Sequence, residues 1–207
     1  MPRRCPVYLL LDTSGSMSGE PIQAVRDGVN MIVETLLSEP TALDTAWLSV
    51  ITFSETAEEK VPLTPITAFN PPYIEADGLT AMGGALNLLI DCVERDVQRR
   101  KNEHERGDWR PIVFLLTDGE PTDDRTDDNG ENPFDRALSR LGEAQFATFV
   151  ALGAGEDANI EKLNLIISRV DAEEVKCLES KNAKAEDIKE SFKLLSDIVV
   201  AYVKLAK

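Results

Sequence analysis

Short continuous apolar runs alternate along the chain with segments whose apolar residues recur every three or four positions. The continuous runs predict buried strands at 7–11, 45–53, 111–117 and 147–153, with a last strand at 173–178. The helical spacing predicts a first helix that begins near Pro21 and covers 22–36, and later helices at 82–97, 134–144, 160–167 and 188–203. Strands that alternate with helices in this way predict an α/β fold.

The expected sheet is mostly parallel and doubly wound, with helices on both faces, because its strands read as fully apolar. Residues 58–66 carry two prolines, which favours a strand at the edge of the sheet. In such sheets ligands bind beyond the carboxyl ends of the strands, at the switch point. Asp12 and Asp118 each follow a predicted strand directly, so we expect both at that rim.

Composition and charge narrow the choice of function. The chain has 207 residues, 43% of them hydrophobic, which predicts one domain over 1–207 with a core at about 5–205. The net charge of −15 disfavours nucleic acid and anionic membrane surfaces, and favours cations and basic partners. Cys5, Cys92 and Cys177 are far apart in the sequence and odd in number, so we expect free or buried thiols.

The first twelve residues, MPRRCPVYLLLD, combine basic residues with an apolar run, as a signal peptide does. The run is shorter than the ~7–15 residues of a signal-peptide core, and it leads directly into Asp12. We therefore interpret it as the first buried strand. No run approaches the ~20 apolar residues of a membrane span, so we expect a cytoplasmic protein.

Several hydroxyl and carboxylate side chains follow these strands. Asp12, Ser14 and Ser16 alternate in LLLDTSGSM, where one turn can present all three oxygens. Thr80 in DGLTAMGG precedes a helix, and Asp118 in LLTDGEPTD follows a strand. Such oxygens suit Mg²⁺, Mn²⁺ or Ca²⁺, and three neutral hydroxyls leave the ion much of its positive charge. This set therefore predicts a divalent-cation site with a position for an incoming carboxylate.

Three segments, VYLLLDTSGSM, DGLTAMGGAL and VFLLTDGEPTDD, resemble in order the signatures of von Willebrand factor A (vWA) domains. In that family these motifs form the metal-ion-dependent adhesion site (MIDAS), and the resemblance covers about 5–205. It implies a doubly wound sheet with one short antiparallel edge strand. The chain looks most like the bacterial single-domain proteins of the tellurium-resistance TerY type.

Carried over by position, the resemblance implies a set of metal ligands. These are Asp12, Ser14, Ser16, Thr80 and Asp118. The hydroxyls would contact the ion, for which we expect Mg²⁺, and the aspartates would act directly or through water. A Glu or Asp of a protein partner would complete the shell. The TerY type implies a stress or tellurite-resistance complex, with a protein kinase or PP2C-type phosphatase as partner.

Other interpretations stay open. Asp12, Ser14 or Ser16 could be helix caps, and Thr80 could cap the helix that follows it. The acidic run at 123–128 could be a calcium loop, but Arg125 breaks the EF-hand pattern, so a solvated loop beside the metal is favoured. His104 is the single histidine, which excludes histidine triads and His-ligated zinc.

An enzyme is the main competing class of function. A Mg²⁺-dependent phosphohydrolase could use an aspartate at a strand end as nucleophile. The chain has Asp12-Thr13-Ser14 where haloacid-dehalogenase-type enzymes need two carboxylates, and it lacks the Walker lysine. We therefore expect no enzymatic activity. A structural subunit with a vestigial metal site is the third possibility.

Overall fold

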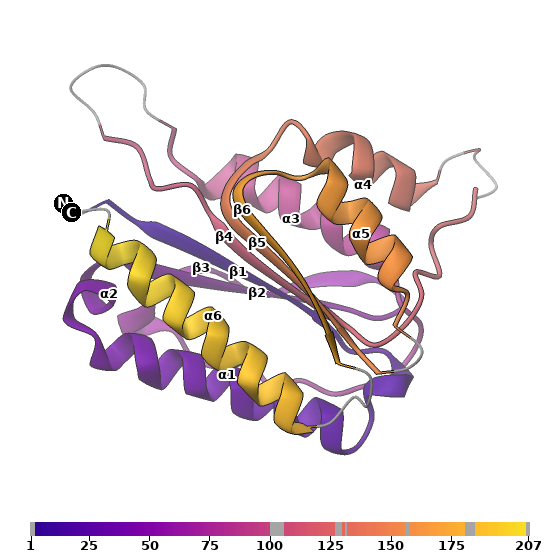
Figure 1. Ribbon diagram of the computed structural model, residues 1–207, viewed down its shortest axis with the longest axis horizontal. Coiled ribbons are helices and arrows are strands. Elements are labelled where there is room, and N and C mark those ends of the chain that lie inside the picture. The colour runs from indigo at the N-terminus through magenta and orange to yellow at the C-terminus, as the bar shows by residue number, and fades with distance from the viewer. Residues whose placement is uncertain are drawn as a thin grey trace.

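The centre of the molecule is a six-stranded sheet with the strand order β3-β2-β1-β4-β5-β6 (Figure 1). The structure is a computed structural model, and it describes residues 3–99, 106–126, 130, 132–155, 158–180 and 185–205. The strands are β1 (Cys5–Asp12), β2 (Ala46–Phe53), β3 (Ala57–Pro65), β4 (Ile112–Thr117), β5 (Gln145–Ala154) and β6 (Asp171–Ser180). Each contains or overlaps a strand predicted from the sequence.

Helices cover both faces of this sheet (Figure 1). On one face lie α1 (Glu20–Ser38), α2 (Pro40–Thr45) and α6 (Ala185–Leu205). On the other lie α3 (Met82–Asp96), α4 (Pro133–Leu141) and α5 (Ile160–Arg169). Two short 3₁₀ helices, η1 (Gly15–Met17) and η2 (Ile66–Ala68), complete the elements among the described residues. The α/β fold with helices on both faces is confirmed.

The topology places a switch point beside β1. This strand lies between β2 and β4 and is parallel to both, whereas β3 is antiparallel to β2 at the sheet edge. The chain therefore builds one half of the sheet through β2 and β3, then crosses to build the other half from β4. The proline-containing edge strand predicted at 58–66 is confirmed as β3, which is nine residues long.

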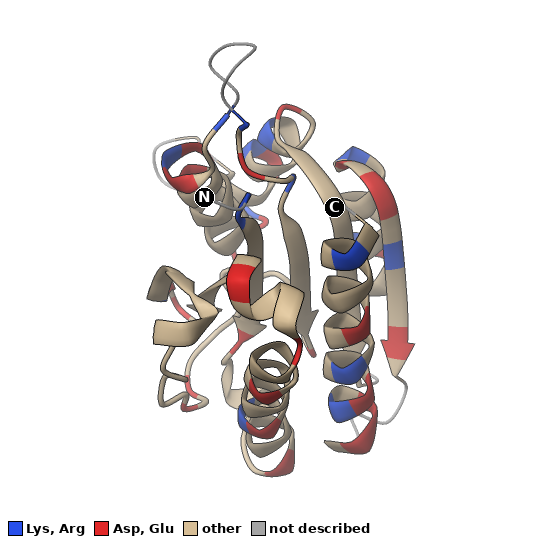
Figure 2. Cartoon of the chain, turned by 90° about the vertical axis from the view of Figure 1, so that its left-hand side faces the viewer, with Lys and Arg blue, Asp and Glu red and all other residues tan. Residues whose placement is uncertain are grey.

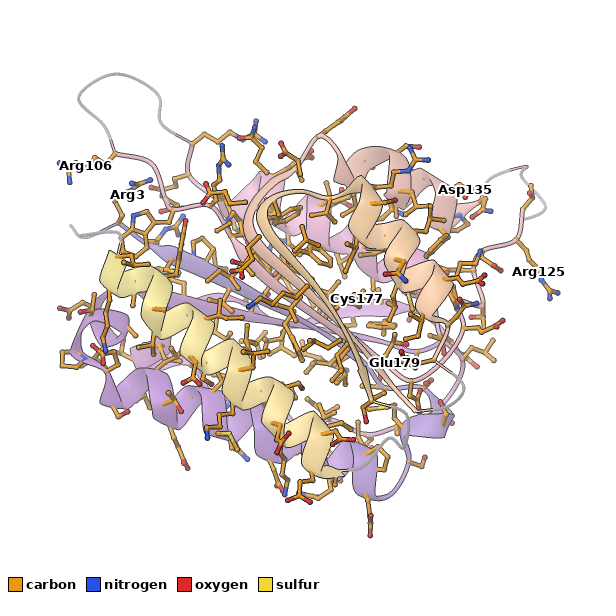
Figure 3. All side chains as sticks on the ribbon, viewed as in Figure 1. Arg3, Arg106, Arg125, Asp135, Cys177 and Glu179 are labelled. Atoms are coloured by element: carbon orange, nitrogen blue, oxygen red, sulfur yellow. The ribbon has the colours of Figure 1, made fainter. Side chains whose placement is uncertain are left out.

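Two apolar layers hold the helices to the sheet, and Figure 3 shows their side chains between the layers. Leu9 and Leu11 of β1 face α1 and α6, whereas Tyr8 and Leu10 face α3 and α4. The helices α1 and α6 pack closely because Gly28 has no side chain: a Cβ there would lie 2.2 Å from Cδ2 of Phe192. Polar residues lie at and directly after the ends of the central strands, among them Asp12 and Thr117.

Figure 2 marks the acidic and basic residues along the chain. Acidic and basic residues both occur along α6. Within the described ranges, no helix is both long and apolar enough to cross a membrane.

Candidate metal centre

The loop after β1 is folded around the end of that strand. Asp12 is the last residue of β1, and its Oδ1 accepts a hydrogen bond of 2.8 Å from the Ser14 amide. The Thr13 amide donates to the Phe53 carbonyl at 2.8 Å, which fixes the loop to the end of β2. Met17 in η1 is fully buried in the core. The apolar anchor and these hydrogen bonds together hold the hydroxyls of the DxSxS segment at the rim of the sheet.

Asp12 is completely buried, with 0% of its surface exposed. Its Oδ2 accepts a hydrogen bond of 2.5 Å from the Thr117 hydroxyl, at the end of β4. Burial raises the pKa of Asp12 to about 6, against the lowering effect of the hydrogen bonds from Thr117 and Ser14, and the nearby charge of Asp118 raises it further. Both carboxylate oxygens of Asp12 therefore have protein partners.

Two serine hydroxyls converge with Asp118, which lies directly after β4. The Oγ atoms of Ser14 and Ser16 are 3.0 Å apart. The Ser16 hydroxyl donates to Oδ1 of Asp118 at 2.7 Å, and Ser14 Oγ is 3.5 Å from the same oxygen. Segments about a hundred residues apart in the sequence thus place three oxygens within hydrogen-bonding distance of one another.

Thr80 lies on the third segment of this group. Its amide donates to Thr122 Oγ1 at 3.2 Å, and the Thr122 amide donates back to the Thr80 carbonyl at 2.9 Å. Its hydroxyl faces Gly119, where a Cβ would lie 3.4 Å from Thr80 Oγ1. The Gly15 amide donates to the Gly78 carbonyl at 3.0 Å, which joins the segment to the DxSxS loop. The structure therefore brings all five predicted residues to one end of the β1–β4 pair.

The spacing of the oxygens fits a small divalent cation. Mg²⁺ binds oxygens at about 2.1 Å in an octahedron, so that neighbouring oxygens are about 3.0 Å apart. The distances of 3.0 Å between Ser14 and Ser16 and 2.7 Å between Ser16 and Asp118 are close to that value. No group of three or more His, Cys, Asp or Glu residues in the described parts of the chain could hold a metal ion. A cation at this rim would depend on the hydroxyls.

Neither Thr80 nor Ser14 caps a helix through its side chain. The helix α3 begins at Met82, and no side-chain cap comes from its N-cap residue. Its first amides are bound instead by Asp123, whose carboxylate accepts from Gly83 at 3.0 Å and from Gly84 at 2.7 Å. Likewise, Ser14 precedes η1 without capping it through its side chain.

The acidic run is partly engaged in structural contacts. Asp123 binds the start of α3, and Asp124 forms an ion pair of 3.1 Å with Lys162 of α5. The other two acidic residues of the run, at 127 and 128, lie outside the described residues, as does His104. The favoured interpretation of a solvated loop beside the metal therefore does not hold for Asp123, whose carboxylate binds the start of α3.

Sequence reasoning missed two residues of the site. Thr117 is the polar end of an otherwise apolar strand, and its hydroxyl holds Asp12. Gly78 has a backbone φ of +83°, which favours glycine, and its carbonyl accepts the hydrogen bond from the Gly15 amide. Thr117 could have been identified from the sequence, because it is a polar residue at the end of a buried strand, directly before Asp118.

A comparison with protein-family models places this chain in a known family. The model of the von Willebrand factor type A domain matches residues 7–193 of this chain. An uncharacterised protein of Synechocystis sp. is 28% identical over 171 residues, which cover 79% of this chain and 36% of that protein. The chain therefore spans about a third of the length of this curated relative.

Solved structures share the fold. A von Willebrand factor type A protein from Catenulispora acidiphila superposes with a TM-score of 0.66 at 19% identity, over 97% of this chain and 43% of that one. Proximal thread matrix protein 1 from the mussel byssus, solved with a zinc-occupied MIDAS motif, has a TM-score of 0.57 at 22% identity, over 99% of this chain and 46% of its own. At these identities the likeness concerns the fold.

Proposed function

Because this chain belongs to the von Willebrand factor type A domain family, we propose that it is a metal-ion-dependent protein-interaction module. A divalent cation at the rim of the sheet would bind an acidic side chain of a protein partner. The residues that would hold the cation are Asp12, Ser14, Ser16, Thr80 and Asp118. The assignment of one domain over 1–207 stays a prediction.

One observation carries this proposal. The Ser16 hydroxyl lies 3.0 Å from that of Ser14 and 2.7 Å from the Asp118 carboxylate, so the oxygens already have the spacing of cation ligands. The zinc-occupied MIDAS motif of the mussel protein supports a divalent cation in this fold. For this chain we propose Mg²⁺, with Mn²⁺ as a substitute, because all the donors are oxygens.

The two aspartates would have different roles. Both oxygens of Asp12 accept hydrogen bonds, from Ser14 and Thr117, so Asp12 would support the site from behind the hydroxyls. Asp118 contacts the hydroxyls directly and would lie next to the ion. The bound ion would supply a positive charge that attracts a carboxylate. Neutral hydroxyls would leave that charge incompletely neutralised, so the partner's Glu or Asp would add a ligand.

We propose binding without enzymatic turnover. A phosphohydrolase of the competing type needs a free carboxylate as nucleophile, whereas Asp12 is buried and accepts two hydrogen bonds. The setting in a bacterial stress or tellurite-resistance complex, with a kinase or PP2C-type phosphatase as partner, follows from the TerY-type resemblance of the three motifs. Hydrolysis of p-nitrophenyl phosphate that is lost in Asp12→Ala would contradict the non-enzymatic proposal.

The test is affinity capture from a lysate in Mg²⁺ and in EDTA. The baits are the wild-type chain, Asp118→Ala, and Asp44→Ala as a control at an exposed position of α2. We expect at least one protein that is retained by wild type and Asp44→Ala in Mg²⁺, and lost in EDTA and in Asp118→Ala. Proteins retained equally under all conditions would contradict a metal-dependent interaction.

A further inference from the structure

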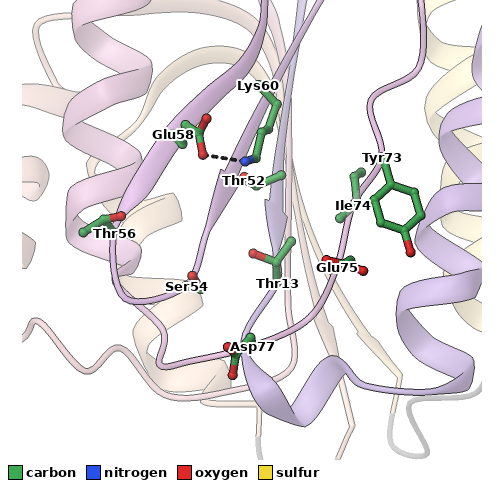
Figure 4. Close-up of a pocket in the computed structure, with 10 residues that line it drawn as sticks. All are labelled: Thr13, Thr52, Ser54, Thr56, Glu58, Lys60, Tyr73, Ile74, Glu75 and Asp77. Carbon is green, nitrogen blue, oxygen red and sulfur yellow. Dashed lines mark hydrogen bonds and ion pairs between the residues drawn. The ribbon is translucent and has the colours of Figure 1, made fainter.

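The sheet has two outer edges, formed by β3 and β6. The β3 edge is irregular, because Pro62 and Pro65 have no amide hydrogen and the register with β2 shifts along the strand. Figure 4, a close-up of a pocket at this edge, shows Glu58 and Lys60 of β3 joined in an ion pair of 2.5 Å. Prolines, charged side chains and bulges are the features that keep an edge strand from pairing with another chain. The β3 edge is therefore protected.

The β6 edge is long and regular. This strand covers ten residues, Asp171–Ser180, and its sequence has no proline or glycine. Its register with β5 stays constant from the pair of Gln145 and Asp171 to the pair of Ala154 and Ser180. Figure 2 shows β6 as the outermost strand of the sheet. Such a strand presents an outer row of amide and carbonyl groups to any extended segment that lies alongside it.

The outer backbone groups of β6 have no partner among the described residues. The strand pairs with β5 on one side, and Gly155, which follows β5, donates to the Ser180 carbonyl at 2.6 Å. Cys177 and Leu178 pack against the two opposite apolar layers, so both faces of the strand are anchored. Residues 171–179 are nevertheless all partly or fully exposed. Unpaired edges of this kind accept an added strand, and main-chain hydrogen bonds then supply the affinity.

The charges of β6 differ between its two faces. Side chains alternate along a strand, so Glu174 and Lys176 share one face, where they form an ion pair of 3.1 Å. Asp171, Glu173 and Glu179 share the other face. This second face has three acidic residues and no basic one along the strand. It is the face that indicates which kind of segment fits the edge.

Two of these three carboxylates are available for a cationic group. Glu173 forms an ion pair of 3.1 Å with the exposed Arg110. In the part of the chain that the structure describes, neither Asp171 nor Glu179 forms an ion pair, and both are exposed. Opposite charges across two strands stabilise their pairing, and like charges weaken it. A second copy of this chain, whose net charge is −15, would bring two acidic strands together. A basic segment would match the edge.

We propose that β6 is a docking edge to which an extended basic segment of another protein adds a further strand. The segment would form hydrogen bonds with the outer backbone groups of β6. It would present lysine or arginine at every second position to Asp171, Glu173 and Glu179. This surface is separate from the proposed metal-dependent one, because β4 and β5 lie between β6 and β1. The protein would thus have two independent binding surfaces.

The experiment uses the full chain in EDTA, so that the metal site takes no part, and three short synthetic peptides. In the first, lysine alternates with threonine and valine in a sequence that reads the same in both directions, so it fits parallel and antiparallel addition. The second has the same sequence with every amide nitrogen methylated, which keeps the charge and removes the amide donors. The third has glutamate in place of lysine. Calorimetry measures the affinity, and hydrogen exchange locates the binding.

We expect the basic peptide to slow the amide exchange of β6. It should bind at least about tenfold more tightly than its methylated form, because several main-chain hydrogen bonds are lost in that form. The glutamate peptide should not bind.

Two double variants test the role of charge. Asp171→Asn with Glu179→Gln removes the two unpaired charges of β6, and we expect it to weaken binding of the basic peptide roughly three- to tenfold. Glu34→Gln with Asp44→Asn removes the same charge from exposed positions of α1 and α2, and should bind like the wild type.

Several results would overturn the inference. Equal affinity for the basic peptide and its methylated form would mean attraction by charge alone, without an added strand. No binding of the basic peptide, equal losses in the two double variants, or slowed exchange outside β6 only would also contradict it. If β6 amides of the protein alone exchange slowly at high concentration and faster on dilution, the edge belongs to a second copy, and the inference is wrong.

Discussion

The hydroxyl of Thr117 lies 2.5 Å from Oδ2 of Asp12, and it joins the end of β4 to the end of β1. These neighbouring parallel strands flank the switch point of the sheet. Asp12 therefore cannot turn without breaking a buried hydrogen bond. The candidate site depends on this contact because the Asp12 carboxylate in turn holds the Ser14 amide at 2.8 Å.

Replacing Thr117 with valine should damage both the fold and the site. The change leaves Asp12 Oδ2 buried without its donor, so the free energy of unfolding should fall by about 1–3 kcal/mol. Replacing a residue that holds a metal ligand in place typically lowers metal affinity by roughly tenfold or more. We therefore expect the affinity of the site for Mn²⁺ to fall by about that factor. Urea unfolding and Mn²⁺ titration measure the two effects. Thr117→Ser keeps the hydroxyl, and equal losses in both variants would contradict the role of this bond.

The pKa of Asp12 predicts a pH dependence of the metal-free protein. This pKa is about 6 in the folded chain against an ordinary value of 3.8, so the folded state binds the proton more tightly than the unfolded state does. The resulting stabilisation is present below the lower pKa and is lost as the pH rises through about 6. Relative to Asp12→Asn, the wild type should lose about 2 kcal/mol of unfolding free energy between about pH 4.5 and 7.5. A difference that does not change with pH would contradict the assignment.

Asp123 should stabilise the molecule through α3. Its carboxylate binds the amides of Gly83 and Gly84 at the start of the helix, where negative charge is also favourable. Asp123→Ala should therefore lower the free energy of unfolding by about 1–2 kcal/mol. Asp124→Ala breaks only the partly exposed ion pair with Lys162, and should cost less than about 1 kcal/mol. Thermal or urea unfolding measures the stability of the two variants. Equal losses of unfolding free energy in both would contradict the capping role of Asp123.

The strands and their rim residues could be predicted because apolar runs end at polar residues. Asp12 and Asp118 each follow such a run, and parallel strands place their carboxyl ends together, so their proximity followed from the fold class. The helix α2 could not be predicted in this way, because six residues are too few to show a period. It begins at Pro40, and only Glu39 separates it from the end of α1 at Ser38.

The roles of single polar residues were harder to predict than the elements. A cluster of aspartates usually marks a solvated loop, but one member, Asp123, binds a helix start some forty residues earlier in the chain. The hydrogen bond of the Thr117 hydroxyl was equally hard to predict, because its partner, Asp12, belongs to another strand. Such contacts form between segments that are distant in the sequence, so a local sequence pattern does not predict them.

The cysteines should differ in reactivity. Cys5 and Cys92 are 0% exposed, and burial raises the pKa of Cys92 to about 12, whereas Cys177 on β6 is partly exposed (Figure 3). Because the thiolate is the reactive form, iodoacetamide at about pH 8 should modify Cys177 first and leave the other two until the chain unfolds. Peptide mass spectrometry identifies the modified site. Rapid modification of Cys5 or Cys92 in the folded protein would contradict the described packing.

The central claim is that hydroxyls and aspartates at the ends of β1 and β4 hold a divalent cation. Calorimetric titration of Mn²⁺ into the wild-type chain, Asp118→Ala and Asp44→Ala tests it most directly. We predict one saturable site in the wild type and in Asp44→Ala, and its loss in Asp118→Ala. Equal binding in all three proteins, or no saturable binding in the wild type, would contradict the account.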